Sequence, residues 1–140
     1  MSEYVVDASV AVKWFIPEIH SEAAWRLRNT EYRLHVPAFF TLEVGNTFCK
    51  KVRRREIAPD VADAALRELH RLPLQRHPDE LLFAPAFKLA THTKRSLYDC
   101  LYLALAMMLG GRLVTADRPF FKALDRSPLA THLCWVEEVP

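Results

Sequence analysis

Short apolar segments of strand character alternate with helical segments along the whole sequence. Strands are expected at about residues 3–6, 33–36, 112–115 and 132–137, with a weaker one near 72–77. Helices are expected at about residues 9–15, 19–29, 38–55, 79–92, 97–109 and 119–124, with one more after Pro59. Strands that alternate with helices favour a parallel sheet covered on both faces. The sequence therefore predicts an α/β protein.

The 140 residues are expected to form one domain, 1–140, because no repeat, low-complexity tract or Gly/Ser linker divides them. The first residues do not show the basic and then apolar pattern of a signal peptide. The most apolar helix, 97–109, is too short to span a bilayer and contains an acid. Three cysteines without a CxxC pair argue against a disulfide framework or a zinc site. We therefore expect a cytoplasmic protein without membrane association.

The charge pattern leaves two interpretations open. A formal net charge of +2 is too small to indicate a nucleic-acid-binding protein by itself. The segment "KKVRRR" (50–55), however, places five positive charges in six residues. Such a run is either a solvated helix face or a surface that contacts RNA or a protein partner. The sequence has neither P-loop nor GxGxxG glycines, so it gives no support to nucleotide binding of those kinds.

Two of the predicted strands lead directly into an aspartate. Val5 and Val6 precede Asp7, and "RLVT" (112–115) is followed closely by Asp117. In open parallel sheets, ligands bind beyond the carboxyl ends of the strands, where the strand order reverses. We therefore expect Asp7 and Asp117 to lie at one edge of the sheet, beside a binding site.

Two further acids stand in apolar helical segments. Glu43 lies in "FFTLEVGNTF" and Asp99 in "SLYDCLYLAL". Three of the four acids also have a structural explanation: Asp7 and Asp117 as helix N-caps, and Asp99 as part of a capping box with Ser96. Glu43 has no comparable explanation, although a glutamate beside an apolar stripe costs free energy unless it is paired or hydrogen-bonded.

Taken together, the four acids favour a metal site. Four carboxylates gathered at one sheet edge repel and raise one another's pKa, and no basic residue beside them in the sequence is expected to compensate. Mg²⁺ and Mn²⁺ prefer oxygen ligands and would relieve this repulsion. The hydroxyl groups of Thr115 and Ser9 would add polar atoms to the same site.

The segments that carry these acids resemble the acidic motifs of a known family. "VVDASV", "TLEVGN", "SLYDCLYLALA" and "LVTADRPF", in this order, are similar to the four motifs of the PIN domain. The compact single-domain form most resembles the VapC toxins of toxin–antitoxin pairs. One difference stands out: many relatives carry a second acid two residues after the last motif acid, where this chain has Pro119.

The resemblance implies a three-layer α/β/α sandwich with a central parallel sheet. It also implies an Mg²⁺- or Mn²⁺-dependent endoribonuclease that acts as the toxin of a type II toxin–antitoxin system. The residues implied as catalytic and metal-binding are Asp7, Glu43, Asp99 and Asp117, and those implied in support are Thr115, Ser9 and Asn46. The implied partners are an RNA substrate, an antitoxin bound between the early helices (9–29) and the helix 38–55, and a second copy of the chain.

RNA that approaches an acidic pocket requires basic side chains around it. The candidates for contacts with RNA or with the antitoxin are Lys50, Lys51, Arg53, Arg54, Arg55 and Arg118, and further basic residues that could contact RNA are Lys13, Lys94 and Arg95. Trp14 is expected in the core or, as an alternative, exposed and stacked on RNA bases. The alternative function is a non-catalytic RNA- or antitoxin-binding module with a vestigial acidic pocket.

Overall fold

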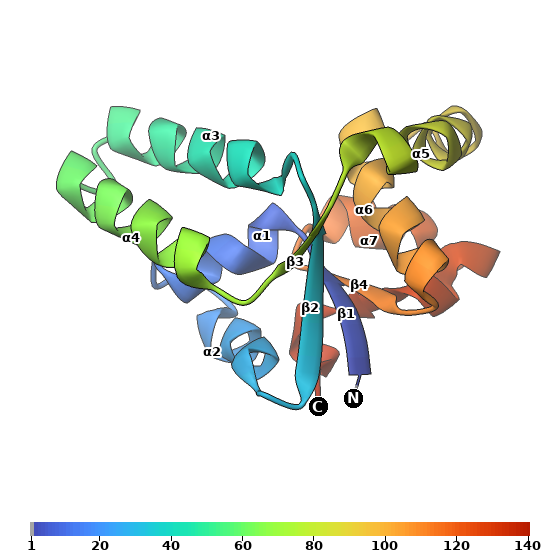
Figure 1. Ribbon diagram of the computed structural model, residues 1–140, viewed down its shortest axis with the longest axis horizontal. Coiled ribbons are helices and arrows are strands. Elements are labelled where there is room, and N and C mark those ends of the chain that lie inside the picture. The colour runs from blue at the N-terminus through green and yellow to red at the C-terminus, as the bar shows by residue number, and fades with distance from the viewer. Residues whose placement is uncertain (1) are drawn as a thin grey trace.

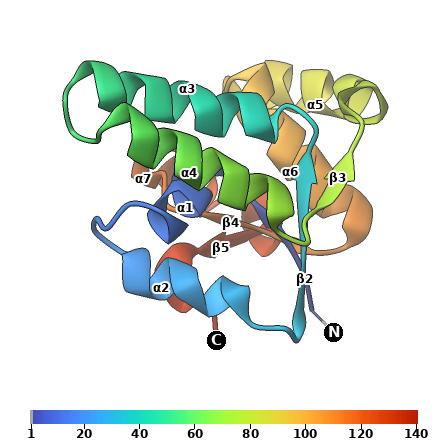
Figure 2. The same cartoon turned by 60° about the vertical axis from the view of Figure 1, so that its left-hand side comes forward.

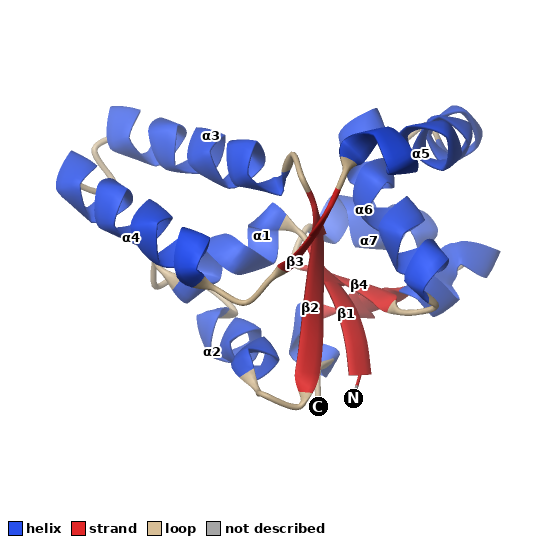
Figure 3. Ribbon diagram, in the orientation of Figure 1, coloured by secondary structure: helices blue, strands red, loops and turns tan. Residues whose placement is uncertain are grey.

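The computed structural model describes residues 2–140 and is built around five parallel strands. These are β1 (Ser2–Val6), β2 (Tyr32–Pro37), β3 (Gln75–His77), β4 (Arg112–Thr115) and β5 (Leu133–Trp135), arranged in the order β3-β2-β1-β4-β5. The central strand β1 therefore lies between β2 and β4, although β4 comes more than 100 residues later (Figure 3). The predicted parallel sheet is confirmed.

Helices cover both faces of this sheet (Figure 1). On one side lie α1 (Ala8–Ala11), α2 (Ser21–Trp25) and the pair formed by α3 (Phe40–Arg53) and α4 (Pro59–Arg71). The other side is covered by α5 (Asp79–Thr93) and α6 (Leu97–Leu109), while the shorter α7 (Arg118–Leu124) follows β4. This arrangement is the predicted three-layer α/β/α sandwich. Figure 2 shows that α3 and α4 run side by side above α1.

The two earliest helices are shorter than the sequence predicts. The segment expected at 9–15 is α1 followed by a 3₁₀ turn at Val12–Trp14, and the segment expected at 19–29 is α2 followed by a 3₁₀ turn at Arg26–Arg28. Pro17 separates the two segments, and α2 begins only after His20, which adopts a left-handed conformation with φ of 65°. The last strand is also shorter than expected, because residues 136–138 form a 3₁₀ turn.

Helix α6 packs between the sheet and α5. Residues 100–106 of this helix are all buried, which explains its almost continuous apolar sequence. The helix ends at Gly110, whose φ of 65° suits glycine. At Gly111, which precedes β4, a Cβ atom would lie only 2.6 Å from the carbonyl oxygen of Glu3, so a side chain there would separate β4 from β1. Within residues 2–140, no helix combines the length and apolar character that crossing a membrane requires.

Strand register brings the two predicted sheet-edge acids together. Val6 at the end of β1 is paired with Val114 of β4, and the backbone N–H of Asp7 donates to the carbonyl oxygen of Val114 over 3.4 Å. All of the strands are parallel, so their carboxyl ends share one edge. Asp7 and Asp117 leave the sheet at this edge, as predicted.

Candidate active site

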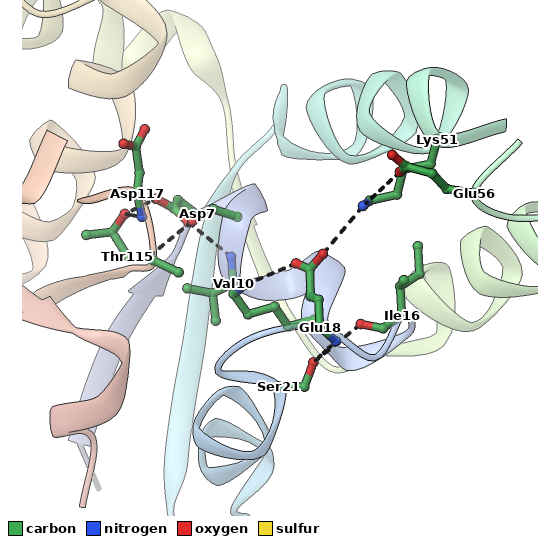
Figure 4. Close-up of polar contacts among 12 residues, drawn as sticks. Asp7, Val10, Ile16, Glu18, Ser21, Lys51, Glu56, Thr115 and Asp117 are labelled. Carbon is green, nitrogen blue, oxygen red and sulfur yellow. Dashed lines mark hydrogen bonds and ion pairs between the residues drawn. The ribbon is translucent and has the colours of Figure 1, made fainter. Parts of the chain in front are cut away.

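Asp7 is a buried carboxylate held by hydrogen bonds on both of its oxygens (Figure 4). Its Oδ1 accepts from Ser9 Oγ at 2.5 Å and from the N–H of Val10 at 3.2 Å, which makes Asp7 the N-cap of α1. Its Oδ2 accepts from Thr115 Oγ1 at 2.6 Å. Burial raises the pKa of Asp7 to about 7, although the hydrogen bonds from Ser9 and Thr115 partly oppose this rise. The charge of Glu43 raises it further.

Asp117 lies beside Asp7, at the start of α7. Its Oδ1 accepts from the N–H of Phe120 at 3.1 Å, so it caps that helix, and its own N–H donates to Thr115 Oγ1 at 3.0 Å. Ser9 Oγ similarly accepts from the N–H of Ala116 at 3.1 Å. The two predicted supporting hydroxyl groups therefore connect the end of β1 to the end of β4. Both aspartates therefore act as helix N-caps, and both lie at the sheet edge where the sequence predicts a site.

Asp99 is brought to the same region by α6. The predicted capping box is present in part, because Ser96 Oγ accepts from the N–H of Asp99 at 3.0 Å. Burial is the main cause of a raised Asp99 pKa, and the charge of Asp117 adds to it. The sequence-based expectation that no nearby basic residue compensates the acids is wrong here: Arg95 Nη2 lies 3.9 Å from Asp99 Oδ2. Arg95 comes four residues before Asp99 and lies just before the first turn of α6, so its guanidinium can approach the Asp99 carboxylate.

Glu43 projects from α3 and receives a hydrogen bond from a residue that the sequence analysis missed. Tyr102 Oη donates to Glu43 Oε1 at 2.6 Å. Burial raises the pKa of Glu43 most strongly; the Tyr102 hydrogen bond opposes this, and the charges of Asp99 and Asp117 add to the rise. Tyr102 lies three residues after Asp99 on α6, so the two share a helix face. That spacing is the signal that could have identified it.

Among the residues that the structure describes, Asn46 is the one predicted supporting residue without a hydrogen bond to the acids. It is exposed on α3 and lines a cavity of about 480 Å³ between α3 and α4, together with Phe48 and Ala62. Within residues 2–140, its side chain makes no hydrogen bond to any of the four acids. The structure therefore places Asn46 on an apolar groove beside the site.

The charges of the four acids affect one another's pKa values, but the acids do not form a preorganised metal-binding group. Charge repulsion raises the pKa of Asp7 through Glu43, that of Glu43 through Asp99 and Asp117, and that of Asp99 through Asp117. In the part of the chain that the structure describes, however, no three His, Cys, Asp or Glu side chains lie close enough to hold a metal ion jointly. The donor set still fits Mg²⁺ or Mn²⁺, because all of its atoms are hard oxygens and Mg²⁺ usually binds one or two carboxylates and keeps several waters.

The predicted basic contacts fall into two groups. Lys50, Arg53, Arg54 and Arg55 are exposed at the end of α3 and in the turn that follows. Lys51 instead pairs with Glu18 at 3.4 Å and with Glu56 at 3.5 Å. Arg118 lies over the ring of Trp135, 4.0 Å from its centroid. The first group remains the better candidate for contacts with a polyanion.

Two residues considered for RNA contacts are in the interior. Trp14 is only 4% exposed, and its Nε1 donates to the carbonyl oxygen of Ala24 at 2.8 Å, so its expected core position is confirmed and base stacking is excluded. Lys13 is also buried, and its Nζ lies 3.0 Å from Glu18 Oε1. Neither side chain is available to a substrate.

Comparison with known proteins identifies the family. The family model described as the PIN domain matches residues 4–126, a range that includes all four acids. The chain is 36% identical over 116 residues to ribonuclease VapC3 of Pyrobaculum aerophilum, covering 81% of this chain and 88% of that protein. It is 32% identical over 121 residues to ribonuclease VapC3 of Mycobacterium tuberculosis, covering 86% of this chain and 87% of that protein.

Solved structures show the same fold. A crystal structure of a Pyrobaculum aerophilum protein superposes with a TM-score of 0.68 at 23% identity, covering 97% of this chain and 85% of that one. A toxin–antitoxin complex from Klebsiella pneumoniae gives a TM-score of 0.63 at 15% identity, covering 97% of this chain and 99% of that one. With the fold, the acids and the curated relatives in agreement, the chain belongs to the PIN-domain family, as a relative of the VapC ribonucleases.

Proposed function

We propose that this chain is a Mg²⁺- or Mn²⁺-dependent endoribonuclease that acts as the toxin of a type II toxin–antitoxin pair. The observation that carries the proposal is the buried Asp7 carboxylate, which Ser9 and Thr115 fix at the carboxyl edge of the sheet and which the charge of Glu43 also influences. A purely structural N-cap does not need burial among like charges. The relatives named as VapC ribonucleases support the same activity.

The fixed acids are suited to binding a cation and to handling a proton. Asp7 and Asp99 are the principal metal ligands in this proposal, with Glu43 and Asp117 as further ligands, either directly or through water. A carboxylate offers about four acceptor positions, so Asp7 keeps capacity beyond its three hydrogen bonds. A bound Mg²⁺ or Mn²⁺ supplies Lewis acidity, which lowers the pKa of a coordinated water and stabilises charge on the phosphoryl group.

Glu43 is the acid to which we assign the proton from the attacking water. Tyr102 holds its Oε1, which leaves Oε2 to accept the proton, and burial raises the pKa of the Glu43 carboxyl above its ordinary value. A carboxylate with a raised pKa is a stronger base than an ordinary one, which favours general base catalysis near neutral pH. Tyr102 then acts as a positioning residue, because its hydrogen bond fixes the orientation of the Glu43 carboxylate.

The antitoxin is proposed to bind beside α3. The apolar groove between α3 and α4, lined by Phe48, Val52 and Leu66 among others, has a volume of about 480 Å³ and adjoins the surface predicted for this partner. An amphipathic segment placed in such a groove would bury its apolar face there. A basic side chain of the partner could then reach the acids from the Glu43 side.

A homodimer is proposed through the outer surface of α5 and α6. Large apolar side chains are exposed there, including Phe83, Phe87 and Met108, beside a cavity of about 570 Å³ lined by Leu89 and Ala104. Exposed apolar patches of this kind mark contact surfaces. Light scattering should report a dimer for the wild type and a monomer for Phe87→Glu, whereas a dimeric Phe87→Glu protein would place the interface elsewhere.

Cleavage of RNA by the purified chain tests the nuclease proposal. RNA should be cut when Mg²⁺ or Mn²⁺ is present and remain intact in EDTA. Asp99→Asn should lose this activity, because it removes one of the four acidic ligands while keeping the backbone N–H that Ser96 accepts. Asp63→Asn is the matched control, since Asp63 is exposed on α4, and it should cleave as the wild type does. Cleavage that EDTA leaves unchanged contradicts the metal-dependent mechanism.

The same assay addresses the alternative function. A non-catalytic RNA- or antitoxin-binding module would bind RNA without cutting it in any divalent metal. Expression of the wild type without an antitoxin should arrest growth, and Asp99→Asn should restore it. Equal arrest by both proteins would show that growth inhibition does not depend on this acidic site.

A further inference from the structure

The loop between α5 and α6 places a cation, Arg95, beside the acids. The proposed mechanism does not use this cation. Lys94 ends α5 in a left-handed conformation with φ of 61°, and Ser96 caps α6, so Arg95 is the single residue between the two caps. The Arg95 guanidinium lies 3.9 Å from Asp99 and 5.8 Å from the ring centroid of Phe120. Phe120 belongs to the first turn of α7, next to the Asp117 cap. The guanidinium therefore stands between the elements that carry two of the acids.

Hydrogen bonds do not lock Arg95 in this position. Its Nε atom is buried and has no acceptor, and it is the only side-chain nitrogen or oxygen in this condition among residues 2–140. Its contact with Asp99, at 3.9 Å, is longer than a hydrogen bond. A guanidinium carries five N–H donors and stays charged at any physiological pH. Arg95 thus has a fixed charge and donors that the fold leaves without partners.

Arg95 is also the cation nearest to the acids. Of the ion pairs formed within the described part of the chain, only the Arg95–Asp99 pair includes any of the four acids. Its side chain is 29% exposed, so solvent and ligands can reach it. A phosphodiester approaching this pocket meets negative charge, and the planar fork of an arginine matches two oxygens of one phosphate.

We propose that Arg95 binds a phosphodiester group of the RNA at the edge of the acidic pocket. In the RNA-free protein the guanidinium rests on Asp99; when RNA binds, it exchanges this long contact for charge-assisted hydrogen bonds to phosphate oxygens. The exchange gives the donors of Arg95 their acceptors and releases the Asp99 carboxylate. This inference rests on the proposed nuclease function.

The test measures RNA affinity in a background that does not cut. Each protein carries Asp7→Asn, and fluorescence anisotropy follows binding of a short, labelled single-stranded RNA of mixed sequence in Mn²⁺ buffer at several salt concentrations. Arg95→Gln removes the charge and the fork, whereas Arg95→Lys keeps the charge alone. Arg112→Gln is the matched control, because Arg112 is an exposed arginine at the amino end of β4, on the opposite edge of the sheet.

The expected results differ among the three variants. Arg95→Gln should raise the Kd for RNA about tenfold, as the loss of a hydrogen bond to a charged group does. It should also make the slope of log affinity against log salt shallower by about 0.7, the value for one phosphate contact on a single strand. Arg95→Lys should weaken binding less and keep the slope. Arg112→Gln should change neither quantity.

Two outcomes overturn the inference. If Arg95→Gln binds RNA with the Kd and the salt slope of the background protein, Arg95 serves only as a partner of Asp99. If Arg95→Gln does not fold, as melting curves would show, Arg95→Lys decides, and an unchanged Kd for that variant overturns the proposal. Failure of the nuclease proposal has a separate signature, which is a wild type that leaves RNA intact in Mn²⁺ or an Asp7→Asn protein that cuts it at the wild-type rate.

Discussion

Tyr102 on α6 donates a 2.6 Å hydrogen bond to Glu43 on α3, across 59 positions of sequence. The bond joins a helix on one face of the sheet to a helix that lies on the other side. It also lowers the pKa of Glu43, against the larger effect of burial. Burial, the charge of Glu43 and this hydrogen bond together raise the pKa of Tyr102 well above its ordinary value. Removing the hydroxyl should therefore affect both the stability and the chemistry of the site.

Tyr102→Phe should destabilise the protein by about 1 kcal/mol, because the Glu43 carboxylate loses a hydrogen bond while it stays partly buried. The pKa of Glu43 should rise, so cleavage should require higher pH than in the wild type. Urea unfolding and a pH profile of kcat measure the two effects. Tyr98→Phe is the control, since Tyr98 is 60% exposed on the same helix, and it should change neither. A Tyr102→Phe protein with the wild-type pH profile would separate this hydrogen bond from the chemistry.

Asp7 should make the metal-free protein less stable as pH rises. Its folded pKa of about 7 lies above its ordinary value of 3.8, so the folded state binds more protons than the unfolded state between these values. Stability should fall as pH rises through this window, by an amount on the order of 4 kcal/mol. Asp7→Asn should remove most of this pH dependence. Urea unfolding in EDTA, at about pH 5 and about pH 8, measures the part of this change above pH 5, which is about 3 kcal/mol.

Asp7→Asn should also be the more stable protein at the higher pH, by an amount on the order of 1 kcal/mol. This gain is smaller than the full electrostatic effect because an amide nitrogen cannot accept one of the hydrogen bonds that Asp7 receives. If the variant is instead less stable at both pH values, with the wild-type pH dependence, Asp7 acts mainly as the cap of α1.

Mn²⁺ should stabilise the wild type and have a smaller effect on Asp7→Asn. A ligand that binds only the folded state stabilises it by about 2.7 kcal/mol at a hundredfold excess over its Kd. The melting temperature of the wild type should therefore rise along a Mn²⁺ series, and that of Asp63→Asn should rise equally. An equal rise for Asp7→Asn would remove Asp7 from the set of metal ligands.

Glu18→Gln should destabilise the protein by about 2 kcal/mol, because it leaves Lys13 as a buried charge without its partner. Lys13 is 7% exposed and lies 3.0 Å from Glu18, which also pairs with Lys51 on α3. The matched control is Glu22→Gln on exposed α2 surface, which should be neutral. Urea unfolding compares the three proteins, and equal stability would mean that Lys13 finds another partner or water.

The exposed arginines at the end of α3 and just after it should contribute to RNA binding. Replacing Arg53, Arg54 and Arg55 together by glutamine should weaken RNA affinity and reduce its salt dependence, because fewer counterions are released. Lys51→Gln should have a smaller effect, since Lys51 is already paired with Glu18 and Glu56. Anisotropy at several salt concentrations measures both. An unchanged salt slope in the triple variant would make the run a solvated helix face.

Local sequence patterns were sufficient to predict the class of fold and to select four candidate acids. The alternation of strands and helices predicted the parallel sheet, and the aspartates that follow β1 and β4 lie at its carboxyl edge, as predicted. Asp7, Ser96 and Asp117 also accept the cap hydrogen bonds that their positions predicted. These features follow from interactions over a few residues, so a short window of sequence contains them.

Tertiary structure alone decided which groups meet. The hydrogen bond between Tyr102 and Glu43 joins two elements far apart in the sequence, and no local pattern names such partners. The burial of Lys13 could not be predicted from the sequence either, because a lysine in a helical segment is usually exposed. Its interior position is stabilised by the ion pair with Glu18. Periodicity reports that a side chain faces inward, whereas its neighbours depend on how all the elements pack. The sequence thus determined the fold class and the acids, and the packing of α6 and α3 around the end of β1 decided their partners.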